Sequence, residues 1–310
     1  MALKVVALAG GVGGAKLAFG LAQILPADDL SIIVNTGDDF WLYGLRICPD
    51  LDTIVYTLGG LVDSVNGWGI ADDTTNALEA LRRYGEETWF RLGDRDLATH
   101  LLRTQWWRDG ERLTEITRRL ASKLGVNCHI LPMSDAPVAT MVDTIEHGEL
   151  DFQTYFVRLR WQPTVRRLRL SGIENSAMTP ETEKALEDAD VILIGPSNPW
   201  LSIEPILSVP GFREALMARD VPRVAISPIV GGTAIKGPAA KLMQELGYET
   251  SAQAVAAYYG NVINGFVYDV QDAALPVPVA HATTLNTIMT ANTDRIFLAE
   301  NVMNWIQTWS

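Results

Sequence analysis

The sequence predicts an α/β protein with a Rossmann-like, doubly wound and mostly parallel sheet. The first observation is a short apolar run at residues 5–9, which is typical of a parallel strand covered on both faces. A glycine-rich turn follows at residues 10–14, and apolar residues then recur at helical spacing from Leu17 until Pro26 ends the helix. Residues 31–34 form a second β-branched run, so strand, turn, helix and strand succeed one another as at the start of this fold.

Three later apolar runs predict further strands of the same sheet, and each precedes a loop built from glycine, proline, serine, asparagine or similar residues. The runs are residues 126–131, 190–194 and 224–226, and the loops are residues 132–135, 195–199 and 227–232. In open α/β sheets the loops at the carboxyl ends of the strands line the ligand crevice. We therefore expect these loops and the glycine turn to surround one site.

The remaining segments predict a smaller cap of helices and a hairpin. Residues 1–60 and 125–310 are assigned to the Rossmann-like core, and residues 61–124 to a mainly helical insertion. Apolar residues alternate with polar ones at about 151–171, which predicts a hairpin that contributes to the cap.

Composition excludes several classes of partner. The chain has 310 residues with 25 basic and 37 acidic side chains, a formal charge of −12, and this balance disfavours binding to nucleic acid or an anionic membrane. No run approaches the ~18 apolar residues of a membrane span. Two cysteines, Cys48 and Cys128, suit a reducing compartment. We expect a cytoplasmic protein whose partners are small molecules, with no nucleic-acid or membrane partner.

The glycine turn, residues 10–16, has the composition of an anion-binding loop at a helix N-terminus. It matches neither common nucleotide motif. A Walker loop needs glycine at Ala15 and serine or threonine at Leu17, and a dinucleotide loop needs a small residue at Lys16. The alternative is a tight turn without a ligand, with Lys16 facing solvent.

Clustered acids follow the second predicted strand. Asp38 and Asp39 come at its end, and Asp50 lies in a block soon after, where no zinc-type set of histidines and cysteines is available. Carboxylates in this setting suit Mg²⁺. Asp50 and Asp52 would point the same way if their segment were extended. Four other acids are interpreted first as helix caps, which is the usual role of loop aspartates: Asp72, Asp73, Asp94 and Asp96.

Basic and aromatic side chains accompany these acids. Arg46 and Arg95 lie between the acidic blocks and indicate a bound polyanion such as a diphosphate, the alternative being surface ion pairs. Tryptophans concentrate between Trp41 and Trp107, where they could stack on a flat ring or form a core or an interface. Four scattered histidines give no zinc spacing and no nucleophile pair, which disfavours zinc and covalent catalysis.

Taken together, these blocks resemble the 2-phospho-L-lactate transferase family of deazaflavin coenzyme F-420 biosynthesis. Seven blocks in order carry the resemblance: residues 9–17 (AGGVGGAKL), 35–39 (NTGDD), 48–53 (CPDLDT), 92–100 (LGDRDLATH), 130–135 (ILPMSD), 195–199 (GPSNP) and 227–232 (SPIVGG). Each block is weak alone, whereas the ordered set is specific and spans most of the chain.

The resemblance implies an Mg²⁺-dependent transfer reaction in a Rossmann-like, usually dimeric enzyme. The family takes a guanylylated three-carbon acid, lactyl-2-diphosphoguanosine, and passes its phospho-acid to the ribityl hydroxyl of the deazaflavin Fo, so that GMP leaves. Some bacterial members use the enolpyruvyl analogue, and this sequence does not distinguish the two donors.

The resemblance also gives roles to individual residues as hypotheses. Asp38, Asp39 and Asp50 would hold Mg²⁺ and act in catalysis. Alternatively, one of these carboxylates, with Asp50 favoured, would orient the ribityl hydroxyl and take its proton instead of binding the metal. Tryptophans would wall the deazaflavin ring. The substrate-binding candidates are Gly11, Gly13, Gly14, Lys16, Asn35, Arg46, Asp94, Arg95, Ser197, Asn198 and Ser227.

Two other functions compete with this interpretation. A related superfamily branch with a similar glycine-rich start binds a nucleotide sugar and regulates without catalysis, but it would not explain the acids at residues 48–53. The interpretation of the chain as an NAD-dependent oxidoreductase rests on fold analogy alone. Lys16 and the absence of an acid at residues 34–36 count against it.

Overall fold

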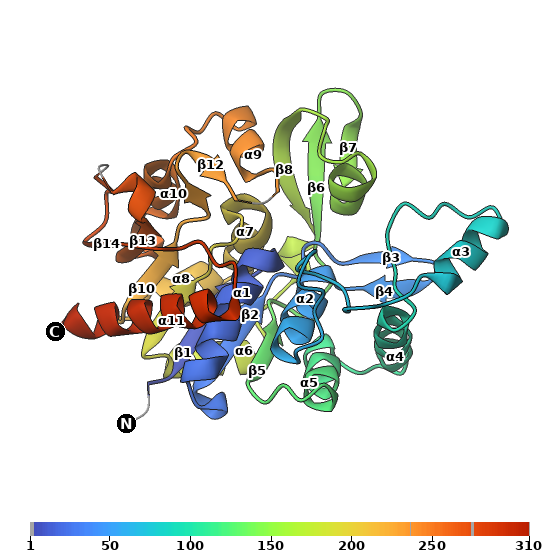
Figure 1. Cartoon of the computed structure of the whole chain (residues 1–310), viewed down its shortest axis with the longest axis horizontal. Helices are drawn as coiled ribbons and strands as arrows, with labels where there is room; N and C mark the ends of the chain where they lie inside the picture. Colours follow the sequence, from blue (N-terminus) through green and yellow to red (C-terminus); the bar gives the residue numbers. More distant parts are fainter. Residues whose placement is uncertain (1–2, 236, 274–275, 310) are drawn as a thin grey trace.

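A seven-stranded parallel sheet forms the centre of the protein (Figure 1). The computed structural model describes residues 3–235, 237–273 and 276–309. The strand order is β14-β13-β10-β9-β1-β2-β5. The strands are β1 (Val5–Ala9), β2 (Leu30–Val34), β5 (His129–Pro132), β9 (Val191–Ile194), β10 (Arg223–Ile226), β13 (Gly265–Asp269) and β14 (His281–Leu285). The predicted Rossmann-like, doubly wound fold is confirmed.

The order of the strands creates a switch point between β1 and β9. From β1 the chain builds outward through β2 to β5, then returns to the other side of β1 and continues through β9, β10, β13 and β14. The loops after β1 and β9 therefore leave adjacent strands in opposite directions. In open α/β sheets this is where the ligand crevice forms.

Helices cover both faces of the sheet. Alternate residues of β1 serve the two cores: Val5 and Ala7 pack in one hydrophobic cluster, Val6 and Leu8 in the other. The first cluster includes residues of α1 (Gly11–Ile24), α2 (Pro49–Leu58), α5 (Leu113–Lys123) and α11 (Asn292–Ile306). The second includes residues of α6 (Pro180–Asp188), α7 (Glu204–Leu207), α8 (Phe212–Met217), α9 (Ala239–Glu245) and α10 (Ala252–Tyr259).

Short helical turns complete the connections. They are η1 (Ala27–Asp29), η2 (Thr154–Arg158), η3 (Ile173–Asn175), η4 (Pro199–Ile203), η5 (Gly260–Val262), η6 (Val270–Asp272) and η7 (Gln307–Trp309). A two-stranded ribbon pairs β11 (Ile229–Val230) with β12 (Thr233–Ala234). Among the helices of the described ranges, none is long and apolar enough to cross a bilayer.

The segment 61–124 contains helices joined by irregular stretches. They are α3 (Asn76–Arg83), α4 (Asp96–Arg108) and α5. Helix α4 packs on β4 (Leu45–Ile47), which pairs with β3 (Phe40–Leu42) in a small hairpin. Figure 1 shows α3 at the end of the molecule farthest from the central sheet. The division into core and insertion stays a prediction.

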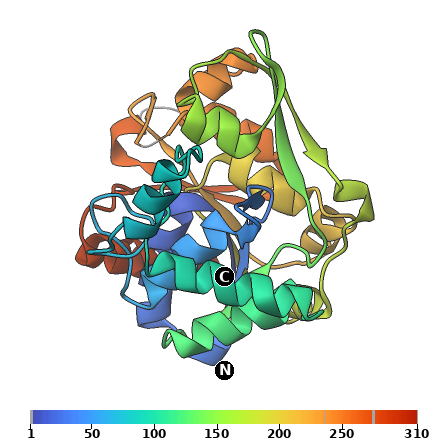
Figure 2. The ribbon, with the colours of Figure 1, turned by 90° about the vertical axis from the view of Figure 1, so that its right-hand side faces the viewer.

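The predicted hairpin at 151–171 is wrong in its first arm. Residues Thr154–Arg158 form a helical turn, and β8 (Val165–Ser171) pairs instead with β6 (Ala139–Thr144), which also pairs with β7 (Gly148–Asp151). The physical reason is visible in the spacing of Phe152, Tyr155 and Phe156, which is three and four residues, as on one helix face. Figure 2 shows this small sheet extending away from the main one.

Helices α1 and α11 approach each other closely at Gly20. A methyl group at this position would collide with the backbone carbonyl oxygen of Arg295. We expect Gly20→Ala to lower the free energy of unfolding by about 1–3 kcal/mol, because overpacking forces the two helices apart. Denaturant unfolding measures the loss. Gln23→Ala, on the exposed side of α1, is the control and should change little; equal stability of Gly20→Ala and wild type would contradict the close contact.

Candidate active site

The carboxylate of Asp50 connects three elements at the switch point. Its Oδ1 accepts a hydrogen bond from the backbone N–H of Gly11 at 2.8 Å, and its Oδ2 accepts one from Nδ2 of Asn35 at 2.9 Å. Oδ1 of Asn35 accepts from the N–H of Gly37 at 2.8 Å. The turn after β1, the end of β2 and the first turn of α2 are thereby joined around one buried acid.

Helix formation separates Asp50 from Asp52. The sequence allowed an extended segment with both carboxylates on one side, and this interpretation is wrong, because Pro49 begins helix α2. Proline is favoured at the first helical position, where its missing N–H costs no hydrogen bond. Residues two apart on a helix point about 200° apart, so Asp50 faces the glycine turn and Asp52 faces Arg103.

Asp38 and Asp50 form a buried acidic pair. Burial raises the pKa of Asp38 well above its usual range, and the charge of Asp50 raises it further. Burial also raises the pKa of Asp50 to about 6, although its hydrogen bonds from Asn35 and Gly11 oppose the shift. Within the described ranges, Oδ1 of Asp38 is buried without a hydrogen-bond partner. Two buried carboxylates with raised pKa values are stabilised either by protons or by a bound cation.

This pair has the chemistry of a divalent-cation site. Hard cations such as Mg²⁺ prefer carboxylate oxygens and retain positions for substrate oxygens and water. The unpartnered oxygen of Asp38 supplies a ligand that no described protein group uses. The residues present therefore fit Mg²⁺.

Asp39 faces a different neighbourhood. Its Oδ2 lies 3.5 Å from Nη2 of Arg46, and both side chains are buried. Burial raises the pKa of Asp39 to about 6, against the opposing charge of Arg46. In the part of the chain that the structure describes, Asp38, Asp39 and Asp50 do not form a group of ligand atoms close enough to share one ion. The structure thus pairs Asp38 with Asp50 and leaves Asp39 beside an arginine.

One compact group of possible metal ligands lies behind the site. Ligand atoms of Asp52, Asp96 and His100 lie within 4.8 Å of one another. Arg103 already provides a cation there, because Nη1 donates to Oδ2 of Asp52 at 3.1 Å and contacts Nδ1 of His100 at 3.1 Å. The hydroxyl of Tyr56 donates to Asp96 at 2.7 Å. This network fastens α4 to α2 and holds the far side of the helix that carries Asp50.

Close backbone packing explains the glycines of the turn. A methyl group at Gly13 would collide with the carbonyl of Pro196, and one at Gly14 would lie 2.6 Å from Oγ of Ser197. Gly11 adopts a φ of 61°. Oγ of Ser197 donates to the carbonyl of Gly10 at 2.8 Å and accepts its N–H at 3.2 Å. The turn after β1 and the loop after β9 are therefore one packed unit.

Two other predicted substrate contacts shape their own loops. Oδ1 of Asn198 accepts from the N–H groups of Trp200 and Leu201 at 3.0 and 3.1 Å, which caps η4. Ser227 exchanges hydrogen bonds with the backbone of Ile229 at 3.0 and 3.1 Å. The hydroxyl of Ser227 is engaged locally, whereas the amide nitrogen of Asn198 is not part of its cap.

Asp94 and Asp73 cap each other's helices. Asp94 accepts from the N–H groups of Asn76 and Ala77 at 3.0 and 2.9 Å at the start of α3, and these bonds lower its pKa, after the larger effect of the Thr74 hydroxyl. Asp73 accepts from the N–H groups of Arg95 and Asp96 at the start of α4. The capping role predicted for these two acids is confirmed. The sequence assigned Asp73 to the helix that contains Leu78 and Asp94 to the helix that contains Leu101, and this assignment is wrong, because each acid caps the other helix.

Arg95, Arg46 and Lys16 lie in three separate environments. The guanidinium of Arg95 donates to the carbonyl of Ala71, and its side chain is 56% exposed. The guanidinium of Arg46 is buried and lies 5.7 Å from the ring centre of Trp107. The amino group of Lys16 donates to the carbonyl of Met289.

The aromatic region combines packed and exposed rings. Phe40, Trp89 and Phe90 contact one another, with ring centres 4.8–6.3 Å apart. Trp41 meets Trp107 edge-on at 5.3 Å, and about half of Trp41 is exposed. These exposed rings offer apolar surface at the edge of the cap.

Two contributors near the acids came from parts of the chain that the sequence motifs did not indicate, and a third lies inside a motif but was not singled out. Nε2 of the buried Gln153 donates to the carbonyl of Asp38 at 3.1 Å, from the turn before η2. The hydroxyls of Thr36 and Thr140 are buried without partners among the described residues. Gln153 and Thr140 are distant in sequence and carry no recognisable spacing, whereas Thr36 lay within the NTGDD block.

Comparison with known families shows which family this chain belongs to. Residues 5–302 match 2-phospho-L-lactate transferase CofD. The chain belongs to this family. It is an enzyme of the transferase class. The resemblance found in the sequence is confirmed.

Curated relatives of the transferase carry two names. A 2-phospho-L-lactate transferase of Methanosarcina mazei is 41% identical over 302 residues, 96% of this chain and 99% of that protein. A phosphoenolpyruvate transferase of Streptomyces griseus is 44% identical over 276 residues, 87% of each chain. A crystal structure of a UPF0052 family member from Bacillus halodurans is 16% identical with a TM-score of 0.62, covers 98% of this chain and 99% of that one, and supports the fold alone.

The acidic pair predicts a pH dependence of stability for the transferase without metal. In the folded protein Asp50 keeps its proton up to about pH 6, whereas an unfolded aspartate releases it near pH 4. The folded-state pKa is raised, so its stabilisation is complete at low pH and is lost as the pH rises through about 6. We expect the free energy of unfolding to fall by up to about 3 kcal/mol across this window on account of Asp50.

Denaturant unfolding between pH 4.5 and 7.5 in the presence of a chelator measures this slope. Asp50→Asn should show a shallower fall than wild type, and saturating Mg²⁺ should flatten the wild-type curve because it favours the ionised acids. Identical slopes for the variant and wild type would show that Asp50 is ionised in the fold.

Proposed function

We propose that the transferase moves a phospho-three-carbon acid from a GMP-activated diphosphate donor to the ribityl hydroxyl of the deazaflavin Fo, and releases GMP. The acid is 2-phospho-L-lactate or phosphoenolpyruvate, and the reaction belongs to coenzyme F-420 biosynthesis. One observation carries the proposal: a buried pair, Asp38 and Asp50, lies beside the glycine turn at the switch point of a chain from this family.

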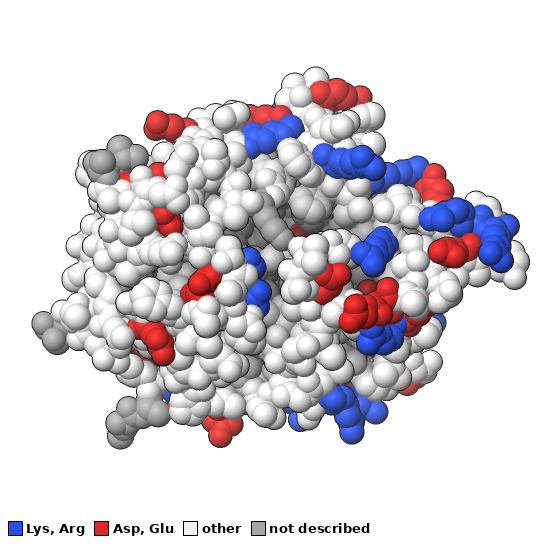
Figure 3. Space-filling model, in the orientation of Figure 1, with Lys and Arg blue, Asp and Glu red and all other residues white. Residues whose placement is uncertain are grey.

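The shape of the surface supports binding of the donor there. Figure 3 shows a hollow near the middle of the face seen in Figure 1, next to the beginning of α1. The loops after β1 and β9 meet at this position, with the N-terminus of α1 directed toward it. A helix N-terminus favours an anion, so the diphosphate and guanosine are placed over the turn at residues 10–14 and the loops at 195–199 and 227–232.

Asp38 and Asp50 are the residues that would hold Mg²⁺ in this proposal, with Asp39 as the more distant candidate beside Arg46. When bound, the ion supplies neutralisation of the charge on the donor's phosphates. The buried Gln153 positions Asp38 through the backbone carbonyl of that residue. Phosphoryl-type transfer depends on positioning and charge stabilisation, so no protein nucleophile is needed.

Asp50 is placed to orient the acceptor. Its carboxylate is fixed by Gly11 and Asn35 beside the glycine turn, where the proposed donor lies, so an ionised Asp50 can accept a proton there. The ribityl oxygen attacks the phosphorus that carries the three-carbon acid, and its proton passes to Asp50. The bond from this phosphorus to the bridging oxygen breaks, and the bridging oxygen leaves on GMP.

The exposed rings around Trp41 and Trp107 are the proposed wall for the deazaflavin, which places the acceptor on the cap side of the site. The proposal also includes a homodimer in the cytoplasm. Light scattering after size exclusion tests the dimer: a mass of one chain at micromolar concentration would remove that part of the proposal.

Turnover with each donor tests the function directly. The purified full chain is incubated with Fo, Mg²⁺ and either lactyl-2-diphosphoguanosine or its enolpyruvyl analogue, and the product mass and GMP are measured. We expect product with at least one donor, and loss of it in excess chelator. Absence of product with both donors, together with stabilisation by a UDP-sugar in thermal shift, would favour the nucleotide-sugar regulator instead.

Substitutions identify the acids that carry the reaction. Asp38→Asn and Asp50→Asn should each lower kcat by about 100-fold or more, because charge neutralisation and proton acceptance act in the transition state. Asp220→Asn, an exposed acid away from the site, is the matched control. Turnover of Asp50→Asn within about twofold of wild type at saturating Mg²⁺ would remove Asp50 from the mechanism.

A further inference from the structure

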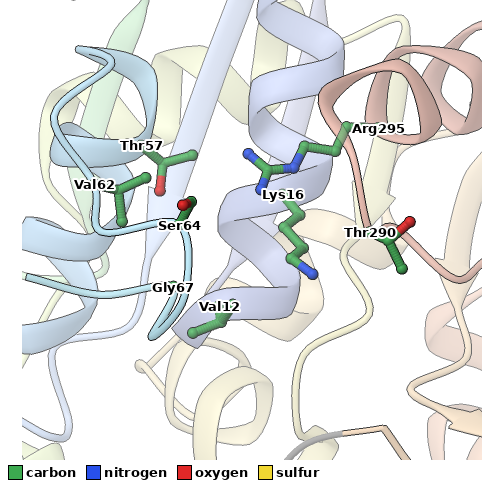
Figure 4. A pocket seen from close by; sticks show the side chains of 8 residues that line it. All are labelled: Val12, Lys16, Thr57, Val62, Ser64, Gly67, Thr290 and Arg295. Carbon is green, nitrogen blue, oxygen red and sulfur yellow. The ribbon is translucent and has the colours of Figure 1, made fainter. Parts of the chain in front are cut away.

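A small cavity lies beside the glycine turn, between α1, the segment after α2 and the start of α11. Its volume is about 30 Å³, and Val12, Thr57, Ser64 and Arg295 are among its lining residues. Figure 4 shows the guanidinium of Arg295 projecting from α11 across α1, toward the side where Thr57 and Ser64 lie. Three segments distant in sequence therefore enclose one cationic group.

Arg295 is held in place but its charge is poorly compensated. Its guanidinium carbon lies 5.4 Å from the ring centre of Phe19 on α1, and its own carbonyl packs on Gly20. Nε is buried without a hydrogen-bond acceptor among the described residues, and the nearby charge of Asp294 only partly offsets the effect of burial on the guanidinium. Burial lowers the pKa of Arg295. A buried N–H donor without an acceptor is costly, so an oxygen acceptor next to Nε of Arg295 would be favourable.

The neighbouring carboxylate is engaged elsewhere. Asp294 accepts from the N–H groups of Thr290 and Ala291 at 2.9 and 2.8 Å and from the Thr290 hydroxyl at 2.6 Å, which completes the first turn of α11. These bonds lower the pKa of Asp294. Its oxygens therefore serve as a helix cap and do not satisfy Arg295.

Lys16 adds a second positive charge at the rim. It lines the same cavity, and Figure 4 shows its amino group directed toward Thr290. Its ammonium group donates to the carbonyl of Met289, and its charge lowers the pKa of Asp294. Two cations thus flank one small space in a chain whose formal charge is −12.

The size of the cavity limits its occupant. A cavity needs roughly 10–15 Å³ by this measure to hold one water, so about 30 Å³ accommodates a group of a few atoms. Hydroxyls of Thr57 and Ser64 on the opposite wall can donate to an oxygen. A phosphate or a carboxylate has this size and this demand for donors.

We propose that Arg295, with Lys16 and the hydroxyls of Thr57 and Ser64, forms a binding site for a single phosphate or carboxylate group. The inference rests on the proposed function for its biological source: Val12 lines the cavity and follows Gly11, which holds Asp50, so the bound group is one end of the anionic donor. A guanidinium fork recognises both groups through paired hydrogen bonds.

Binding to the metal-free full chain, without Fo, tests the site independently of turnover. Inorganic phosphate, GMP and lactate are titrated separately by calorimetry into wild type, Arg295→Gln, Arg295→Lys and Ser64→Ala. We expect Arg295→Gln to weaken the anion that binds by about ten-fold or more, with smaller losses in Arg295→Lys and Ser64→Ala. Arg83→Gln, an exposed arginine on α3, is the matched control and should bind as wild type does.

The pattern across probes identifies the source of the anion. If Arg295→Gln weakens the binding of phosphate and GMP, the site binds a phosphate group of the donor. If it weakens the binding of lactate, the site binds the carboxylate. Wild-type affinity of Arg295→Gln for all three probes, or no binding of any probe to wild type, would overturn the proposal. Circular dichroism and thermal unfolding establish that each variant is folded.

Kinetics with the donor separate this site from the proposed function. In an active preparation, Arg295→Gln should raise the donor KM by about ten-fold with a smaller change in kcat, because the contact binds ground state and transition state alike. Absence of turnover in wild type, with phosphate binding that still depends on Arg295, would overturn the proposed function and leave the anion site standing.

Discussion

The burial of one carboxylate, that of Asp50, organises the whole site. An ionised acid can be buried only where donors or cations compensate it, and here the donors are the Gly11 N–H and the Asn35 amide. These groups end β1 and β2, and Asp50 begins α2. The same bonds therefore fix the glycine turn, the acidic loop and a helix relative to one another, and the loop after β9 is added through Ser197.

A network of buried charged and polar side chains supports the other side of α2. Asp52 faces Arg103, and His100 lies between Asp52 and Asp96 with ring nitrogens 3.7 and 3.2 Å from their carboxylates. Removing one partner of such a buried network leaves an uncompensated charge, which is far more destabilising than loss of a surface pair. The helix that presents Asp50 to the crevice is therefore held from the insertion by charge, whereas the crevice side is left with carboxylates in excess.

Local pattern in the sequence predicted five strands of the main sheet, namely β1, β2, β5, β9 and β10. The runs at 5–9, 31–34 and 190–194 became central strands because, apart from Ser31 and Asp190, every side chain in them is apolar. The loops at the strand ends followed from that. Two strands of the main sheet were missed. β14 is half polar and lies at the edge of the sheet, whereas β13 is fully buried and was not recognised from its sequence. The first strand of the predicted hairpin was wrong because a short segment can fit both the alternating pattern of a strand and the spacing of a helix. In the folded protein, residues Thr154–Arg158 form a helical turn.

The sequence predicted only those parts of the candidate site that lie directly after buried strands. Asn35, Asp38 and the glycine turn follow buried strands, so topology alone brings them together, whereas the direction of Asp39 depends on Arg46 in a separate hairpin. Gln153 donates a hydrogen bond to the carbonyl of Asp38, and Arg295 lines the neighbouring cavity. Both residues lie outside the motifs, and no pattern in the sequence indicates contacts of this kind. Motifs therefore locate the charged groups of this crevice, and long-range packing decides which charges remain uncompensated and so available to a substrate.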